Sequence, residues 1–497
     1  MNKQLKYISI VLCVIMVSSL SAARSNNNRN NLAEQMKDSI VYLAISSHGY
    51  SQIEPWKQRG LSEGWACACA ISEYEVITIA EKVANHAFLR ALRYGQNEFI
   101  GAELKVIDYQ TNLCLIQLDP NQLKEPLKPL TFTEDYPKGD NVDCYWLSSN
   151  NRLFNGRGYL DRARVQRAPT SFGKYLRLIV SDTTQRTDSG EVYCTDSTPI
   201  GIASLSLDNE SGLIPGETIN RFLKAVADNN YEGFGNVGFA ISELLDPAMR
   251  SFLKMPESLT NGVYVADAYN LGTGHDILQK ADVILKIDGN SIDSYGRFEH
   301  PKYEDILFDH LITGKNVGQK IVFEVWRDGQ KIEIETNVKN FKASEMLVPY
   351  YEYDKQPEFI VISGFVFQKL TREYLSEFGR DIAGDSPSNL YYYFRDLAFK
   401  PTEERRDIVV LSYVLPSQFN LGYAGVGQSV VSKFNGMEIS SIKDILTAQK
   451  LNPGSKFDVI EFELEDPVVV ISREQISIAN AFITQNYGVS KLSNIDP

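Results

Sequence analysis

Short runs of apolar and β-branched residues, separated by polar turns, dominate the first half of the chain. We expect strands at residues 39–46, 65–71, 76–80, 102–108, 113–118, 141–147, 175–181 and 199–204. Many short strands joined by polar turns predict a β-sandwich or a β-barrel. The spacing of apolar residues changes at residues 217–228, where they recur three and four positions apart. That spacing predicts an amphipathic helix at the end of the β-rich body.

The second half of the chain carries a different pattern, in which strands and short helices alternate. Residues 231–340 predict a strand at 262–265, helices at 244–253 and 303–311, and a closing hairpin around Asp328-Gly329. A ten-residue pattern at 283–292 returns at 430–439, with the same Lys and Gly positions. An internal repeat of this kind predicts two copies of one structural unit.

The N-terminus predicts a cleaved secretory signal. Lys3 and Lys6 precede an apolar run at 8–17, and small residues at 21–23 follow it. The run is too short for a membrane span, so we expect no integral span and a secreted, periplasmic or cell-envelope location. The formal charge of −13 argues against nucleic acid as a partner.

Cysteine usage gives no sign of a metal or a cofactor. Cleavage would leave five cysteines, none at a metal-type spacing with histidine: Cys67, Cys69, Cys114, Cys144 and Cys194. We therefore predict no metal site and no cofactor. The favoured interpretation is that these cysteines are small, buried, apolar side chains. One disulfide between two of them stays possible in an oxidising compartment.

Five ordered stretches resemble the HtrA/Deg family of trypsin-like serine proteases. They are Ala66-Cys-Ala-Cys-Ala-Ile71, Val76-Ile-Thr-Ile-Ala-Glu81, Asp108-Tyr-Gln-Thr-Asn112-Leu-Cys-Leu-Ile-Gln117, Thr187-Asp-Ser189-Gly-Glu-Val192 and Ile200-Gly-Ile-Ala-Ser204. The resemblance implies a mainly β protein with a chymotrypsin-like double β-barrel followed by two PDZ-like α+β domains. The expected divisions are a signal peptide at 1–23, a flexible tether at 24–35, the barrel domain at 36–230, the first PDZ-like unit at 231–340, the second at 341–490 and a mobile tail at 491–497.

Carried over residue by residue, the protease triad is mostly replaced. Ser189 stands at the nucleophile position, whereas Glu81 stands where the family has its general-base His and Asn112 where it has the orienting Asp. A carboxylate with a pKa of about 4.3 is a much weaker base than an imidazole of about 6.5. Thr187 replaces a family glycine, and Glu191 places a negative charge near the expected oxyanion.

Two loops resemble the ligand loops of PDZ domains. Asn236, Val237, Gly238 and Phe239 match the carboxylate-binding loop in the short form of HtrA proteins, whose backbone N–H groups receive a peptide C-terminus. Gly364, Phe365, Val366 and Phe367 are the corresponding candidate in the diverged second unit. That unit resembles the plant and bacterial Deg subgroup, in which the second PDZ often serves assembly, so we expect a homo-oligomer, a trimer or a multiple of one.

Three functional hypotheses remain open. The first is an inactive HtrA/Deg homologue that binds misfolded or C-terminal protein segments for quality control or scaffolding in the cell envelope. The second is an active, ATP-independent serine endopeptidase that uses Ser189 with Glu81 as base. The third is a structural assembly protein without a peptide ligand.

Overall fold

The computed structural model describes residues 31–495, except 137, 182–186, 196–197, 230 and 465–467. Residues 31–39 form a helix, and its Leu32 and Met36 are buried against the barrel domain. The prediction of a flexible tether is therefore wrong for residues 31–35. The expected signal segment lies outside the described residues. Within the described part of the chain, no helix is long and apolar enough to cross a membrane.

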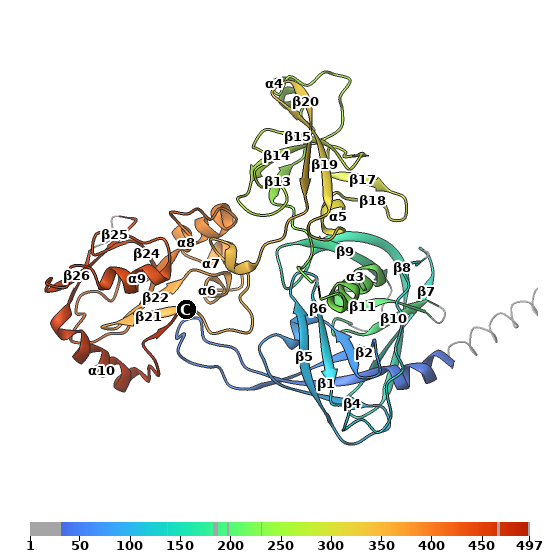
Figure 1. Cartoon of the computed structure of the whole chain (residues 1–497), viewed down its shortest axis with the longest axis horizontal. Coiled ribbons are helices and arrows are strands. Elements are labelled where there is room, and N and C mark those ends of the chain that lie inside the picture. Colours follow the sequence, from blue (N-terminus) through green and yellow to red (C-terminus); the bar gives the residue numbers. More distant parts are fainter. Residues whose placement is uncertain are drawn as a thin grey trace, which may run out of the picture.

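The barrel domain consists of two closed barrels, as expected (Figure 1). The first contains, in spatial order, β1 (Ile40–Ser47), β2 (Ser62–Ala70), β3 (Glu75–Thr78), β6 (Leu113–Leu118), β5 (Ile100–Asp108) and β4 (His86–Arg93). The second contains β10 (Val192–Thr195), β11 (Thr198–Leu207), β12 (Glu210–Pro215), β9 (Lys174–Ser181), β8 (Leu153–Arg167) and β7 (Asn141–Leu147). Helix α3 (Gly216–Ala227) ends the domain with Ile219 and Phe222 fully buried.

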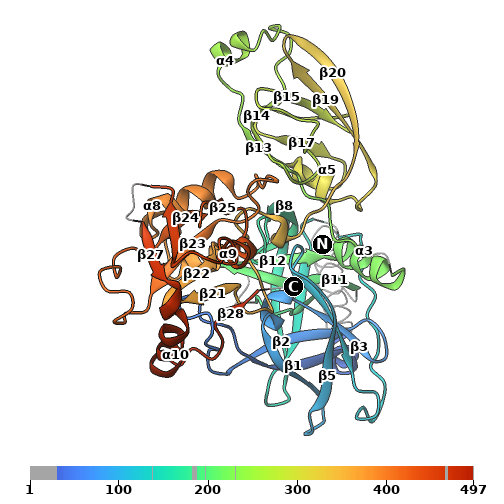
Figure 2. The same cartoon turned by 60° about the vertical axis from the view of Figure 1, so that its left-hand side comes forward.

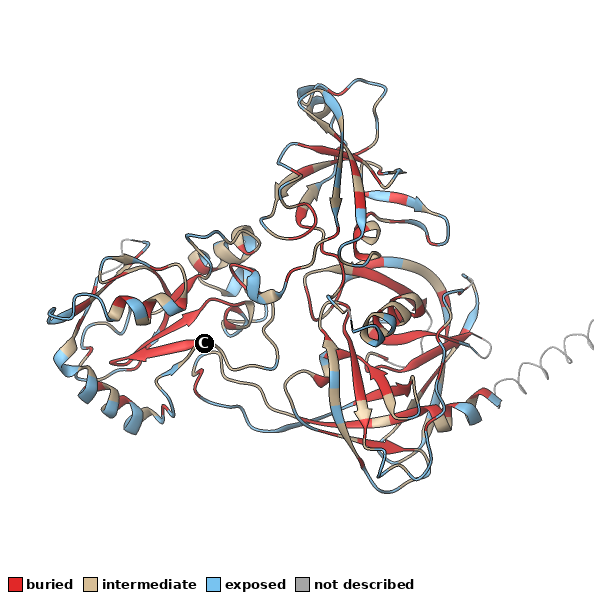
Figure 3. Ribbon diagram, in the orientation of Figure 1, coloured by how far each residue is buried: buried red, intermediate tan, exposed pale blue. Residues whose placement is uncertain are grey.

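Apolar side chains from both barrels meet in the interior of this domain, where the strands are largely buried (Figure 3). Period-2 alternation on β2 sends Cys67 and Cys69 into a core shared with residues of the second barrel. All five cysteines of the described chain are buried and free. Burial raises the pKa of Cys69 to about 12, so this thiol stays protonated and behaves as a small apolar side chain.

The first PDZ-like unit is built on an open sheet that stands beyond the barrel domain (Figure 1). Its strand order is β13 (Phe239–Ser242), β14 (Val263–Ala268), β15 (Val283–Ile287), β19 (Lys320–Arg327) and β20 (Gln330–Asn337), with β16 (Asn290–Ser291) beside β15. Helices α4 (Pro247–Phe252) and α5 (Asp309–Thr313) flank it. Because β13 pairs only with β14 in this order, one of its backbone edges is open.

The prediction of a helix over 303–311 is wrong for its first part. The chain there forms a separate hairpin of β17 (Arg297–His300) and β18 (Glu304–Leu307), and only then enters α5. Contacts with the barrel domain explain the difference. Tyr303 at the hairpin turn is buried, stacks on Tyr136 and hydrogen-bonds its hydroxyl at 2.8 Å, so tertiary packing overrides the local helical pattern.

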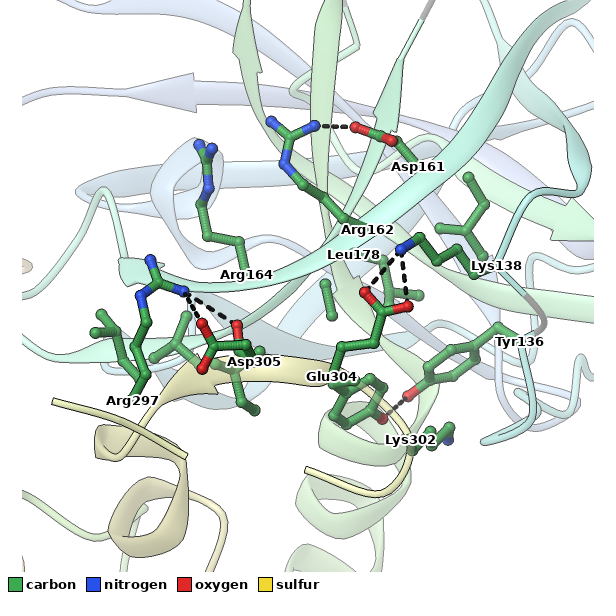
Figure 4. A pocket seen from close by; sticks show the side chains of 16 residues that line it. Tyr136, Lys138, Asp161, Arg162, Arg164, Leu178, Arg297, Lys302, Glu304 and Asp305 are labelled. Carbon is green, nitrogen blue, oxygen red and sulfur yellow. Dashed lines mark hydrogen bonds and ion pairs between the residues drawn. The ribbon is translucent and has the colours of Figure 1, made fainter. Parts of the chain in front are cut away.

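The hairpin packs against β8 and encloses a cavity of about 590 Å³ (Figure 4). Charges line this cavity in pairs. Lys138 reaches Glu304 at 2.8 Å and Arg297 lies 3.5 Å from Asp305. The Lys138–Glu304 pair joins the barrel domain to the hairpin, although an exposed pair of this kind contributes little stability, whereas Arg297 and Asp305 pair within the hairpin itself.

The second PDZ-like unit contains the longest sheet. Its order is β27 (Val469–Ser472), β26 (Phe457–Phe462), β24 (Ser429–Phe434), β23 (Val409–Val414), β22 (Phe365–Lys369), β21 (Phe359–Ile362) and β28 (Ser493–Asn494), with β25 (Met437–Glu438) beside β24. Helices α9 (Ile442–Gln449) and α10 (Ile476–Tyr487) belong to this unit. The expected mobile tail is wrong for residues 493–494, because they pair with β21.

The barrel domain inserts a loop side chain into the second unit. Trp56, between β1 and β2, is only 5% exposed and packs on Phe359 of β21 with ring centroids 6.1 Å apart. The side-chain amide of Gln356 donates to the Pro55 carbonyl at 2.6 Å. These contacts hold the second unit beside the first barrel, as both views show (Figures 1 and 2).

Candidate functional site

The turn that carries Ser189 is held tightly between the two barrels. The Ser189 carbonyl accepts from the Cys67 N–H at 2.7 Å, and the Gly190 N–H donates to the Ala203 carbonyl at 3.0 Å. Gly190 has a φ of +89°, and a Cβ there would lie 2.3 Å from the Cys67 carbonyl oxygen. Only glycine fits this position, so the tight path of the turn is built into the sequence.

The Ser189 N–H, which is a donor for an oxyanion in a trypsin-like site, is already engaged. It donates to the Glu191 side-chain carboxylate at 2.8 Å. Glu191 is 3% exposed, and burial raises the pKa of its carboxyl to about 7 despite hydrogen bonds from backbone N–H groups that oppose the shift. A carboxylate therefore stands where a developing oxyanion needs a free N–H group.

The Ser189 hydroxyl is also directed to a neighbour in the same turn. Its Oγ donates to Asp188 Oδ1 at 3.1 Å. Lys82 Nζ lies 3.4 Å from the same carboxylate oxygen. The Asp188 carboxylate therefore accepts the hydrogen bond of the serine hydroxyl and pairs with an ammonium group at the same time.

Glu81 and Asn112 lie together on the first-barrel side of the turn, but they do not form an acid–base pair. The Glu81 backbone N–H, at the start of α2 (Ala80–Val83), donates to Asn112 Oδ1 at 2.8 Å. The Glu81 side chain is exposed. Asn112 is fully buried with a φ of +68°, a left-handed conformation that asparagine tolerates well. Asn112 thus supports the backbone of α2 here.

A strap formed by residues 349–355 runs along the same side of the barrel domain. Asp354 and Asn85 exchange two hydrogen bonds, each from a backbone N–H to the other's side-chain oxygen, at 2.6 and 2.9 Å. Tyr353 stacks on Tyr109 with ring centroids 4.1 Å apart. Asn85 lies two residues after the end of α2, so the strap fixes the segment that follows the helix of Glu81.

The loop Asn236–Phe239 of the first unit leads into the open edge of β13. Gly238 has a φ of +82° and approaches the Gly272 backbone so closely that a Cβ would lie 2.9 Å from the Gly272 carbonyl carbon. Among the described residues, no acceptor is found for the N–H groups of Val237 and Gly238. The loop therefore offers backbone donors at one end of a free strand edge, an arrangement suited to a peptide carboxylate.

A cavity of about 340 Å³ lies in front of this loop, between β13 and α5. At its rim, Lys174 of β9 lies 3.4 Å from the carboxylate of Asp309 in α5. Burial raises the pKa of Asp309, although Lys174 works in the opposite direction. Together, the cavity, the open edge of β13 and the loop form a candidate site for the C-terminal end of a peptide.

Comparison with known proteins finds related sequences along most of the chain. The PDZ domain family model matches residues 348–494. An Arabidopsis thaliana protein described as "Putative protease Do-like 12, mitochondrial" is 24% identical over 466 residues, which cover 92% of this chain and 86% of that protein. "Protease Do-like 4, mitochondrial" from the same plant is 24% identical over 492 residues, or 96% and 90% of the two chains. Over nearly its whole length the chain is similar to Do-like proteases, which supports its resemblance to the HtrA/Deg family.

A solved structure, "HtrA-type protease AlgW with decapeptide", is similar over 63% of this chain and 98% of its own, with a TM-score of 0.48 and 17% identity. The family's protease chemistry relies on an imidazole, and the homologue described here has five histidines. Within the described structure, the contacts of these histidines are with residues other than Ser189. His48 contacts Gln58, His86 contacts the Val83 carbonyl, and the other three lie in the first PDZ-like unit.

The second candidate ligand loop of this HtrA/Deg homologue has a different setting. Gly364 lies in the turn between β21 and β22, and residues 365–367 are buried within β22. Strand β22 pairs with β21 on one side and with β23 on the other. Its backbone therefore has no open edge to which a peptide strand could add, in contrast to β13.

Several contacts around the candidate sites could not be predicted from the sequence. Lys82 and Asp188 meet across 106 positions, and Lys174 reaches a residue of another domain. Phe399 of the second unit lines the cavity of the first. A charged or aromatic residue in a loop carries no sequence signal for such partners, because tertiary docking alone brings them together.

Proposed function

We propose that this HtrA/Deg homologue is a non-proteolytic protein that binds C-terminal segments of other proteins in the groove of its first PDZ-like unit. The observation that carries the proposal is the free β13 edge, which begins at a loop with unengaged N–H groups and opens onto a cavity. A peptide strand can add to such an edge while its carboxylate receives the loop donors.

The nucleophile turn supports the non-proteolytic part of this proposal. Glu191 takes the Ser189 N–H, Asp188 takes the Ser189 hydroxyl, and a glutamate replaces the general-base histidine. Each change removes one component of acyl-transfer catalysis: the oxyanion donor, the free nucleophile and the base. Binding without cleavage suits capture or scaffolding of misfolded segments, and the predicted signal segment favours the cell envelope or the outside of the cell as its location.

Fluorescence anisotropy with the full chain tests the binding part. A labelled decapeptide with a free C-terminus should bind at least about tenfold more tightly than its amidated form, because the amide lacks the charge that the loop N–H groups receive. Equal binding of the two forms would contradict the proposal.

A pair of glycine variants localises the site. Gly238→Ala should weaken binding of the free peptide by about tenfold, because its φ of +82° and a Cβ contact of 2.5 Å to the Leu271 carbonyl oxygen distort the loop. Gly318→Ala is the matched control, since Gly318 also has a positive φ but a Cβ there meets nothing within 4 Å. We expect normal binding from it. Equal loss in both variants would place the site elsewhere.

A further inference from the structure

The cavity in front of β13 is not formed by the first PDZ-like unit alone. The first unit contributes Phe239 and Asp309. The barrel domain contributes Phe172 from the β8–β9 turn and Lys174 from the start of β9. The second unit contributes Tyr350 and Phe399. Three parts of the chain, far apart in sequence, thus share one cavity wall.

The segment that carries Phe399 is fastened to the first unit. The Asn270 N–H donates to the Phe399 carbonyl at 3.0 Å, and the Asn270 side chain donates to the Pro401 carbonyl at 2.9 Å. Between them, Lys400 Nζ lies 2.7 Å from Asp267 of β14. Asp267 pairs with Ala240 of β13, so the second unit is attached directly behind the strand that borders the groove.

Aromatic rings form the wall that these contacts position. Phe399 stacks on Tyr269 with ring centroids 4.6 Å apart and meets Phe172 edge-on at 4.9 Å. Phe172 also stacks on Phe341 at 5.1 Å. Phe399 is only half-buried, so part of its surface stays available to a further ring. Aromatic pairs in such arrangements gain about 0.5–1.5 kcal/mol beyond the burial of area.

The charges at the rim suit a single carboxylate. Lys174 and Arg167 of the barrel domain face the cavity together with the acid Asp309, so cations exceed acids there by one. Lys174 is already 3.4 Å from Asp309 and could donate to a ligand carboxylate with its remaining N–H groups.

We propose that the second PDZ-like unit supplies a ligand-contacting wall to the groove of the first, and that this composite cavity selects peptides whose C-terminal residue is aromatic. The inference rests on the proposed peptide binding and adds a specificity and a second domain to it. Phe399 contacts the terminal ring, and the Lys400–Asp267 ion pair positions Phe399.

Anisotropy titrations of the full chain test this inference with two labelled decapeptides that differ only in their last residue, Phe or Val. We expect Phe399→Ala to weaken binding of the Phe peptide by about tenfold and that of the Val peptide by less than about threefold. Phe457→Ala is the control, because Phe457 is an exposed phenylalanine of the second unit, on strand β26, that does not line the cavity. Phe457→Ala should change the affinity for neither peptide.

A second variant separates lost contact from lost folding. Phe399→Leu keeps an apolar side chain of similar reach but removes the ring, so it should fold with an unchanged thermal transition and still lose the preference for the Phe peptide. If the wild type binds both peptides through their free carboxylates and Phe399→Leu keeps the Phe preference, the aromatic wall is wrong and the proposed function stands. If neither peptide binds the wild type, both proposals are overturned.

Discussion

Ser189 is expected to stay unreactive when histidine and aspartate are restored at positions 81 and 112, and to become reactive only when Glu191 is also replaced by glycine. In the double variant Glu81→His, Asn112→Asp, the Ser189 N–H would still donate to the Glu191 carboxylate. A negative charge beside the reacting oxygen opposes the oxyanion, and losing a single oxyanion donor already costs about 10²–10³ in rate.

Labelling with a fluorophosphonate probe measures the difference. The triple variant, with Glu191→Gly added, should be labelled at least about 100-fold faster than the double variant. A quadruple variant with Ser189→Ala is the control for labelling elsewhere. Equal labelling of the double and triple variants, whether fast or absent, would show that Glu191 is not the decisive block at this turn.

Replacing Glu191 with glutamine is expected to stabilise the protein, and more so as the pH rises. Burial raises the pKa of Glu191 from 4.5 to about 7, so the folded state holds this proton more tightly than the unfolded state does. Wild-type stability therefore falls as the pH rises from 4.5 through 7 and is constant above that range. The raised pKa of Glu191 lowers the free energy of unfolding of the wild type by about 3 kcal/mol at pH 8 and by less than about 1 kcal/mol at pH 5.

Calorimetric unfolding of Glu191→Gln and wild type at pH 5 and pH 8 tests this expectation. The difference in stability between the two proteins should be small at pH 5 and large at pH 8. The raised pKa of the buried Glu373 is common to both proteins and cancels in the comparison. Glu404→Gln, on an exposed loop, is the control and should match the wild type at both pH values. A constant difference would mean that Glu191 is already charged in the folded state at pH 5.

The internal repeat shows what sequence alone could predict. Residues 283–292 and 430–439 form the same strand–turn–strand, β15–β16 and β24–β25. The turn pairs Asp288-Gly289 and Asn435-Gly436 have positive φ at both residues, which short polar residues and glycine allow. Periodicity and turn chemistry are local properties, and they predict most barrel strands in the same way, whereas the first-unit loop is predicted from its resemblance to PDZ domains.

Docking between domains could not be predicted, because its partners are distant in sequence. The pattern at Gly364–Phe367 resembles a ligand loop, yet its strand acquires neighbours on both sides. Tyr303 lies in a helical pattern but takes a hairpin turn to reach Tyr136. Trp56 and Phe399 are single aromatic residues in loops, and nothing local distinguishes them from exposed ones. The wall that the second unit adds to the groove is formed by contacts of this kind, which arise only when the domains dock.

Binding without cleavage can be tested by the mass spectrum of an unfolded protein substrate, carboxymethylated casein, after prolonged incubation with the full chain. The Ser189→Ala variant serves as the control for trace contaminants. We expect identical spectra of intact substrate with the two proteins. Fragments that appear with the wild type and are missing with Ser189→Ala would show that Ser189 acts as a nucleophile and would contradict the proposed non-proteolytic function.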